Sequence, residues 1–407
     1  MQTNLAAPTR PASRAHPNEI ATLTSIVLVE GAYLSFVPSL PDFLRELGVR
    51  SAADVASWTG LLIGLTPLIV AVTGPFWGKV GDRFGIRLMA LRATLVLWLV
   101  WILMAFVTSP GQFLVLRVAM GLLAGYQSLV VALATNGCAP ERTGLAIARV
   151  QITQVTTAAV SPALGGILAP RIGIRNMFWL TSVACLGAFL AFLLVYRETG
   201  SRAETEKPWT EGFLNIKLVP GLTWLAVMLF LSALIDRSFQ PAATLFAAAH
   251  APIGESAHLA GWLLSIGAVG DGLAAWYCGR KTQDPNLWRF LIIRFGSGAA
   301  VCLGLFFTAS AGVFAALRFL YALVAGGMQT VLFTLASRRV PDTVRTSQFA
   351  VLTSCLLLGH GAGALLTGYL ASWRVTGIFL ADVVWFVVLI AIARRSAPSV
   401  QTVNSKD

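Results

Sequence analysis

The chain has few of the residues from which soluble domains and metal centres are built. Only 12% of its 407 residues are charged, whereas a soluble domain carries roughly 25%. It has four His, and its five cysteines stand singly, without Cys-x-x-Cys spacing: Cys138, Cys185, Cys278, Cys302 and Cys355. The Gly-x-x-x-x-Gly-Lys-Ser/Thr motif for ATP phosphates is also missing. We therefore expect no metal, no cofactor and no enzymatic activity.

Apolar residues dominate instead, at 56% of the chain, with a mean hydropathy of +0.74. A helix needs about 20 apolar residues to cross a bilayer. Runs of that length predict an all-α membrane protein with twelve transmembrane helices in two six-helix bundles. The expected spans are 20–40, 55–77, 88–108, 111–137, 144–169 and 175–196 in the first half, and 219–248, 257–278, 288–309, 313–336, 346–371 and 375–393 in the second.

The distribution of Lys and Arg predicts the orientation in the membrane. Three arginines fall inside spans, namely Arg117, Arg237 and Arg318, and five lie in connections on one side. The other 22 lie in segments that we place in the cytoplasm: 1–19, 78–92, 138–149, 197–217, 279–294, 338–345 and 394–407. This bias predicts a multi-pass protein of the inner cell membrane with both termini in the cytoplasm. It also explains the net charge of +12, so we expect no nucleic-acid partner.

The second half of the chain repeats features of the first at an offset of 201 residues. Gly60, Leu62 and Gly78 recur as Gly261, Leu263 and Gly279, and the residues from Phe113 to Pro140 recur in part from Phe314 to Pro341. Duplicated membrane halves are typical of transporters whose site lies between the halves. The expected organisation is a disordered tail (1–19), a first bundle (20–196), a linker (197–218), a second bundle (219–393) and a tail (394–407).

A Gly-x-x-x-Asp-Arg-x-Gly-x-Arg motif follows the second span and consists of Gly78, Asp82, Arg83, Gly85 and Arg87. It resembles the signature of the major facilitator superfamily, except that Ile86 stands where that family has a basic residue. The resemblance implies that this loop latches the two halves together on the cytoplasmic side. It further implies that the loop releases as the transporter opens inward.

Two further segments resemble motifs of the same family. Arg117 precedes Gly121 by four residues in the fourth span, as in the family's second motif. In proton-coupled members this Arg influences the charge of a nearby acid. The alternative is a structural Arg that bonds to backbone carbonyls. Pro162, Gly165 and Gly166 resemble the antiporter motif, although Ser161 replaces its first Gly. The resemblance covers essentially the whole chain and is closest to the twelve-helix drug:proton antiporters.

Two acids lie at similar depth in matching helices, Glu30 in the first span and Asp236 in the seventh. Hydrocarbon disfavours a charged carboxylate, whereas water or a nearby Arg stabilises it. Such a group can therefore gain a proton from one compartment and lose it to the other. We expect Glu30 and Asp236 to carry protons, with Arg117 tuning them. For Asp236, neutralisation by the adjacent Arg237 is an equal alternative.

In the resembling family, the first, fourth, seventh and tenth spans line a central cavity. Asp271, His360 and Asp382 are weaker candidates for proton carriers, and we expect Asp382 to have a structural role. The cavity residues that we expect are Tyr33, Gln127, Gln151, Gln154, Arg237, Arg318 and Gln329.

These features predict a monomeric secondary transporter that exports amphipathic small molecules or drugs in exchange for protons, by alternating access. The alternative is export of an endogenous organic anion, such as a carboxylate metabolite or siderophore, because three arginines lie within spans. A membrane-embedded enzyme or a sensor is a third class. It is disfavoured because the sequence shows neither a catalytic constellation nor a soluble output domain.

Overall fold

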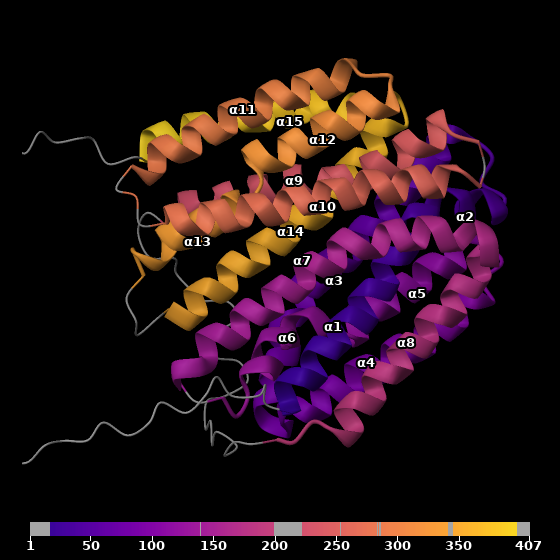
Figure 1. Cartoon of the computed structure of the whole chain (residues 1–407), viewed down its shortest axis with the longest axis vertical. Coiled ribbons are helices and arrows are strands. Elements are labelled where there is room, and N and C mark those ends of the chain that lie inside the picture. The colour runs from indigo at the N-terminus through magenta and orange to yellow at the C-terminus, as the bar shows by residue number, and fades with distance from the viewer. Residues whose placement is uncertain are drawn as a thin grey trace, which may run out of the picture.

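A computed structural model describes residues 17–396 except 139, 199–221, 253, 283, 285 and 341–344. Every element in this part of the chain is helical (Figure 1). Most of both expected tails, and the expected linker from residue 199 on, lie outside the described residues. Helix α1 begins at Pro17, within the expected first tail. The helix starts early because Asn18 donates to the Arg197 carbonyl over 2.6 Å and Glu19 pairs with Arg149 at 2.8 Å.

The first half of the chain supplies the helices of one bundle. They are α1 (Pro17–Phe36), η1 (Val37–Ser39), α2 (Leu40–Glu46), α3 (Ala52–Phe84), α4 (Ile86–Ala105), α5 (Pro110–Leu123), α6 (Tyr126–Thr135), α7 (Pro140–Ile172) and α8 (Ile174–Leu194). The second half supplies α9 (Leu222–His250), α10 (Ser256–Lys281), α11 (Leu287–Phe307), α12 (Ala311–Ala325), α13 (Met328–Ser337), α14 (Arg345–Ala371) and α15 (Gly377–Ser396).

The expected transmembrane spans are present, but two of them are not continuous helices. Eleven described segments are long and apolar enough to cross a membrane. The expected fourth span consists of α5 and α6, and the tenth of α12 and α13. Both break at glycine with positive φ, Gly125 at +58° and Gly327 at +72°. A side chain disfavours that backbone conformation, so these glycines permit the breaks, which hydropathy alone does not reveal.

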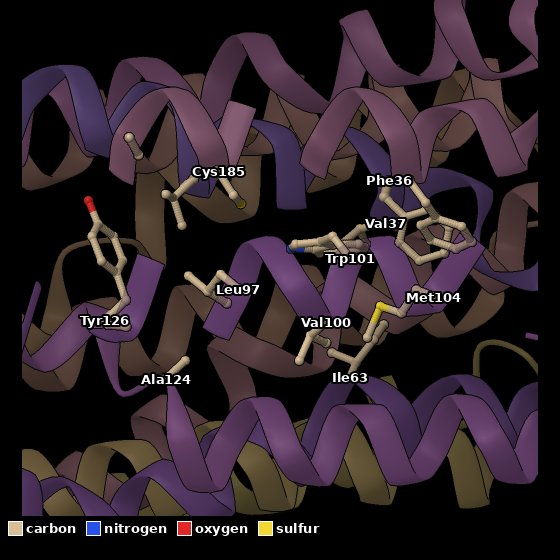
Figure 2. Close-up of a cluster of buried hydrophobic side chains, with 14 of the residues drawn as sticks. Phe36, Val37, Ile63, Leu97, Val100, Trp101, Met104, Ala124, Tyr126 and Cys185 are labelled. Carbon is tan, nitrogen blue, oxygen red and sulfur yellow. The ribbon is translucent and has the colours of Figure 1, made fainter. Parts of the chain in front are cut away.

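Each bundle has its own hydrophobic core, in which aromatic rings predominate. In the first bundle Phe36 packs on Phe178 with ring centroids 4.6 Å apart and on Trp101 at 6.0 Å. Figure 2 shows Phe36, Val37 and Trp101 gathered at one end of this core, with Leu97 and Tyr126 farther along it. In the second bundle, Phe239, Tyr321 and Phe379 form the corresponding aromatic group. Each half therefore has a close-packed core that is built largely from its own helices.

Two helix pairs join the bundles, α3 with α14 and α7 with α10 (Figure 1). Their contacts involve small residues: a Cβ on Gly368 would lie 2.7 Å from the Cα of Gly60. One on Gly272 would lie 2.6 Å from a methyl carbon of Val155. Such spacing lets the backbones of two membrane helices come together. We call these two contacts the seams.

Among the described residues, the seams are close at one end of the molecule and not at the other. The end that holds α2 is the α2 end, and the opposite end, where α1 begins and α15 stops, is the terminal end (Figure 1). The close approaches lie between the α2 end and about mid-length. Toward the terminal end, a Cβ would meet no described heavy atom within 4 Å on four seam-helix glycines: Gly74, Gly78, Gly144 and Gly279.

Hydrogen bonds reinforce the closure at the α2 end. Ser256 of α10 donates to the carboxylate of Asp42 in α2. Arg45 donates to the Ala248 carbonyl over 3.2 Å, and the Ala163 amide donates to the Ser265 hydroxyl over 3.0 Å. All three bonds join one half to the other. The halves are therefore closed against each other at the α2 end.

Candidate substrate cavity and ion sites

A cavity of about 130 Å³ lies between the two bundles. Helices α1, α3 and α4 and the break between α5 and α6 form one wall, and α9 and α14 form the other. Trp101, Leu97 and Tyr126, seen in Figure 2, belong to the first wall. Its lining combines apolar and aromatic side chains with a few polar groups. We call it the central cavity.

Glu30 is the carboxylate on the first wall of the central cavity and is 9% exposed. The Gln154 amide donates to its Oε1 over 3.0 Å. Gln127 and Tyr33 line the same cavity. The structure thus brings together four residues that the sequence singled out, because α1, α6 and α7 meet here.

The second wall of the central cavity carries basic groups. The Arg237 Nη1 donates to the Gln240 Oε1 over 3.0 Å. The Arg237 Nε is buried without a hydrogen-bond partner among the described residues, as is the Nε2 of His360. His360, ranked as a weaker candidate from sequence, lines this wall. The cavity therefore has an acidic side and a basic side.

A second cavity, of about 270 Å³, lies beside the break between α12 and α13. Its lining includes Asp236, Asp271 and Gln329. Arg318 is buried behind it and pairs with Asp271 at 2.7 Å. Asp236 and Glu30 thus face two different cavities, although they occupy matching helices. We call this second site the acidic cavity.

Arg117 is fully buried in the first bundle, at the place that matches Arg318 in the second. Its guanidinium lies 5.2 Å from the Tyr33 ring centroid and 5.3 Å from that of Phe113. None of its three side-chain nitrogens has a hydrogen-bond partner in the described part of the chain. The position 201 residues before Asp271 is Val70, so the repeat supplies no matching acid.

Two arginines that the sequence analysis counted as cytoplasmic charges instead lie beside the helix breaks. Arg92 of α4 donates to the Ala124 carbonyl over 3.0 Å and stacks on Trp77 at 3.3 Å. Arg294 of α11 donates to the Leu323 carbonyl over 3.0 Å and also to that of Gly326. These carbonyls have lost helical partners, so the guanidinium groups satisfy them. The repeat could have predicted this arrangement, because both halves have an Arg in their third span and glycine in their fourth.

Two remaining residues lie away from both cavities. Gln151 is exposed and lines neither of them. Asp382 is fully buried in the second bundle, where its carboxylate accepts a 2.8 Å bond from Ser238. That geometry matches the structural role considered from sequence.

Comparison with known families agrees with this architecture. The family model described as Major Facilitator Superfamily matches residues 22–311 and 225–407, which together take in nearly the whole chain. The chain belongs to the Major Facilitator Superfamily. It is therefore a multi-pass membrane protein of a family of transporters, not of enzymes.

Similar curated proteins carry names of one kind. "Multidrug resistance protein MdtG" of Proteus mirabilis is 26% identical over 367 residues, which cover 88% of this chain and 90% of that protein. The protein of the same name from Yersinia enterocolitica is 27% identical over 353 residues, covering 86% of this chain and 85% of the relative.

Solved structures show the same fold. A bacterial homolog of the human lysosomal transporter Spinster, in an inward-facing and occupied conformation, aligns with a TM-score of 0.73 at 15% identity and covers 95% of this chain and 97% of its own. The human organic anion transporter MFSD10 aligns with a TM-score of 0.67 at 14% identity, covering 93% and 99%. The expected major facilitator fold is confirmed.

The family's signature loop joins α3 to α4 at the terminal end. Gly85 has a φ of +94°, and the next amide, of Ile86, donates to Glu198 over 2.9 Å. Arg87 donates to the Leu193 carbonyl over 2.8 Å. These bonds anchor the loop on the end of α8, in its own half. Arg83 is exposed beside Phe84, and the Asp82 side chain lies outside the described residues.

The segment that resembles the antiporter motif lies in the α7–α10 seam and beside α1. A Cβ on Gly166 would lie 2.5 Å from the Ala257 carbonyl oxygen, and Gly261 packs on the Pro162 carbonyl. Gly165 faces the backbone of Ser35 in its own half. Pro162 and Gly166 thus contact the opposite half directly, at the end where the halves are closed.

Proposed function

We propose that this member of the Major Facilitator Superfamily exports amphipathic small molecules or drugs across the inner membrane in exchange for protons. The names of the similar proteins support efflux of drugs. The bias of basic residues supports a cytoplasmic terminal end with both termini inside. The protein acts as a monomer in this proposal, because the cavity between its own halves supplies a complete site.

The observation that carries the proposal is a buried carboxylate in a cavity between two rigid halves. The central cavity is lined largely by apolar and aromatic groups such as Tyr33, Trp101 and Leu357, which suit an amphipathic solute. Glu30 adds one group that can exchange a proton with water. The exported solute and the imported proton would then occupy the central cavity alternately.

The closed α2 end supports alternating access. With the terminal end in the cytoplasm, closure at the α2 end corresponds to a carrier that faces inward. In that state the signature loop, with Gly78 and Arg87, is anchored on α8 in its own half. Rocking the halves about mid-length would open the seam at Pro162 and Gly166, beside Gly165, and bring this loop against the other half.

Asp236 in the acidic cavity is the second proton site of the proposal. Its carboxylate lies near Asp271, which is already paired with Arg318. A second negative charge beside that pair is costly, so a proton on Asp236 relieves it. Arg117, whose guanidinium lies beside the Tyr33 ring without a hydrogen-bond partner among the described residues, is the group that tunes the proton sites in this proposal.

The direct test is transport into inside-out membrane vesicles with an acidified lumen. A neutral amphipathic dye separates proton coupling from charge recognition of the solute. Wild type should accumulate the dye, and Glu30→Gln or Asp236→Asn should lower gradient-driven uptake about tenfold while dye exchange without a gradient continues. Glu46→Gln is the matched control, because Glu46 forms a half-exposed pair with Arg175 at the α2 end.

Undiminished gradient-driven uptake in both variants would refute proton coupling at these acids. Absence of dye movement in wild-type vesicles, with or without a gradient, would refute export of amphipathic solutes. Dye uptake by Glu46→Gln vesicles must equal that of wild type, since the carboxylate removed in this variant lies outside both cavities.

Export of an organic anion is the second candidate function. Arg237 and His360 line the central cavity, and one buried nitrogen of each has no hydrogen-bond partner among the described residues, so the Arg237 cation with a bond from His360 would hold a carboxylate. Comparing uptake of a lipophilic cation with that of an aromatic carboxylate, in the same vesicles, separates the two candidates. Uptake of the carboxylate alone would favour the anion exporter.

A further inference from the structure

The geometry of the central cavity points to a zwitterionic amphiphile as its preferred substrate. In this inference a protonated amine of the solute binds Glu30, and a carboxylate at its other end binds Arg237 and His360. It rests on the proposed export function and specifies the class of solute. The evidence is the arrangement of charges on the two walls.

Opposite charges face each other across the cavity without forming an ion pair. Glu30 belongs to α1 in the first bundle, and Arg237 belongs to α9 in the second. Five ion pairs within 4.0 Å occur among the described residues, and Glu30–Arg237 is not one of them. A solute that carries both charges can therefore lie between the two groups and neutralise each of them.

Both walls also retain unused hydrogen-bonding capacity. Glu30 accepts a bond from Gln154 over 3.0 Å and is also bonded by Gln127, and a carboxylate with about four lone-pair sites can still accept from an ammonium group. On the other wall the Arg237 Nε and the His360 Nε2 are buried without partners among the described residues. His360 is only 9% exposed and lines the cavity. Buried polar groups are normally satisfied, so these two require a ligand or water.

The space between the charged groups suits a small aromatic body. Tyr33, Trp101 and Met120 line one side, and Leu357 lines the other. A cavity of about 130 Å³ is comparable with an engineered cavity of roughly 150 Å³ that holds one benzene ring. A single ring with an amine at one end and a carboxylate at the other is therefore the simplest fit.

A solute with one charge would leave the opposite wall uncompensated. A cation alone leaves Arg237 facing an apolar group, and an anion alone leaves Glu30 in the same position. Burying an unpaired charge is costly, so each loss should weaken binding about tenfold, the change expected for one charged hydrogen bond. Discrimination should therefore depend on both ends of the solute.

A set of four matched probes tests this directly. Para-(aminomethyl)benzoic acid, a single ring, is zwitterionic, its methyl ester is a cation, its N-acetyl derivative is an anion, and the doubly capped form is neutral. Binding of each radiolabelled probe to the purified full-length protein in lipid nanodiscs gives four dissociation constants. The zwitterion should bind about tenfold more tightly than either singly capped form.

Two variants assign each preference to its wall. Glu30→Gln should abolish the advantage of the zwitterion over the N-acetyl form and keep its advantage over the ester. Arg237→Gln should do the reverse. Glu46→Gln and Arg50→Gln are matched controls that lie outside the central cavity and should retain both preferences. Each variant is first checked for monodisperse behaviour, and His360→Gln provides a second change on the basic wall.

Transport of the same four probes in proteoliposomes separates the possible failures. Equal binding and transport of the zwitterion and its capped forms would overturn the inference on substrate class and leave the export function standing. Preferences that survive both Glu30→Gln and Arg237→Gln would also overturn it. If none of the four probes moves in either direction of the proton gradient, the export function fails together with the inference.

Discussion

At the scale of single residues, Arg117 and Arg318 occupy matching positions in the two halves but have different surroundings. Arg318 is buried and has a carboxylate partner, Asp271, at 2.7 Å. Arg117 is equally buried but packs between two aromatic rings without such a partner. A cation–π contact stabilises by roughly 0.5–2 kcal/mol. Removing one partner of a buried ion pair costs more, about 3–5 kcal/mol. The Arg318–Asp271 pair therefore contributes more to the stability of the second half than the ring contacts of Arg117 contribute to that of the first half.

Removing the carboxylate of that pair should destabilise the protein. Asp271→Asn leaves Arg318 buried without its counter-ion, and we expect a loss of about 2 kcal/mol, below the usual 3–5 because Asp271 is 32% exposed. The measurement is the apparent Tm of the purified protein. The double variant Asp271→Asn with Arg318→Gln should regain part of the lost stability, because no unpaired charge is then buried. If the losses of apparent Tm in the two single variants simply add in the double variant, the proposed pairing is contradicted.

At the scale of helices, the breaks in the fourth and tenth spans place polar backbone beside both cavities. The central cavity reaches Ala124 and Gly125, and the acidic cavity reaches Gly326 and Gly327. Unpaired backbone groups at membrane depth occur only where protein or water satisfies them. Arg92 and Arg294 provide that satisfaction in the two halves. We infer that these two-residue breaks set the depth of each site.

A side chain at the second break should be poorly tolerated. Gly327→Ala places a Cβ at a φ of +72° and 3.0 Å from the Ala274 oxygen, and the backbone conformation alone costs about 1–2 kcal/mol. We expect a lower apparent Tm and weaker transport. Gly296→Ala is the control, because Gly296 lies within α11 with open space around it. An equal apparent Tm for the two variants would refute this account of the break.

At the scale of the whole molecule, closure is confined to one end. The bonds from Asp42 to Ser256 and from Arg45 to Ala248 join the halves at the α2 end. Toward the terminal end, a Cβ on four glycines of the seam helices would meet no described heavy atom within 4 Å. Because each half has its own core, the halves can move as rigid bodies about the middle of the seams. The same two seams must then loosen at the α2 end when the terminal end closes.

A disulfide at the α2 end should arrest that movement. Asp42 and Ser256 are hydrogen-bonded side chains from opposite halves, so Asp42→Cys with Ser256→Cys should cross-link under mild oxidation. We expect transport to fall at least tenfold in the oxidised form and to return with a reductant. Wild type has five free cysteines in the structure and should show no such sensitivity. Full activity of the cross-linked protein would contradict alternating access.

The fold could be predicted from the sequence because hydropathy and duplication act over long stretches. Runs of about 20 apolar residues must be helical in lipid, since the backbone has no water to bond. The twelve spans and the family resemblance followed from that rule and from the loop at Gly78 to Arg87. The breaks at Gly125 and Gly327 did not follow, because both halves of each broken span remain apolar.

The candidate site could be predicted only in part. Glu30, Tyr33 and Gln127 line one cavity and Gln154 bonds to Glu30 there, because acids and amides in apolar helices turn away from lipid. Hydropathy did not reveal that Asp236 and Gln329 face a separate cavity, since that depends on how α9 and α13 are rotated about their axes. Nor did it reveal the contribution of His360 to the basic wall.

The sequence by itself determined that this chain lies in the membrane, that it consists of two related halves and that few ionisable groups lie within the spans. Each of these depends on composition and periodicity, which are properties of the chain alone. Only the tertiary structure decided which charges meet. Glu30 and Arg237 share a cavity, whereas Asp236 and Glu30 do not, because helices from different bundles bring them together or keep them apart.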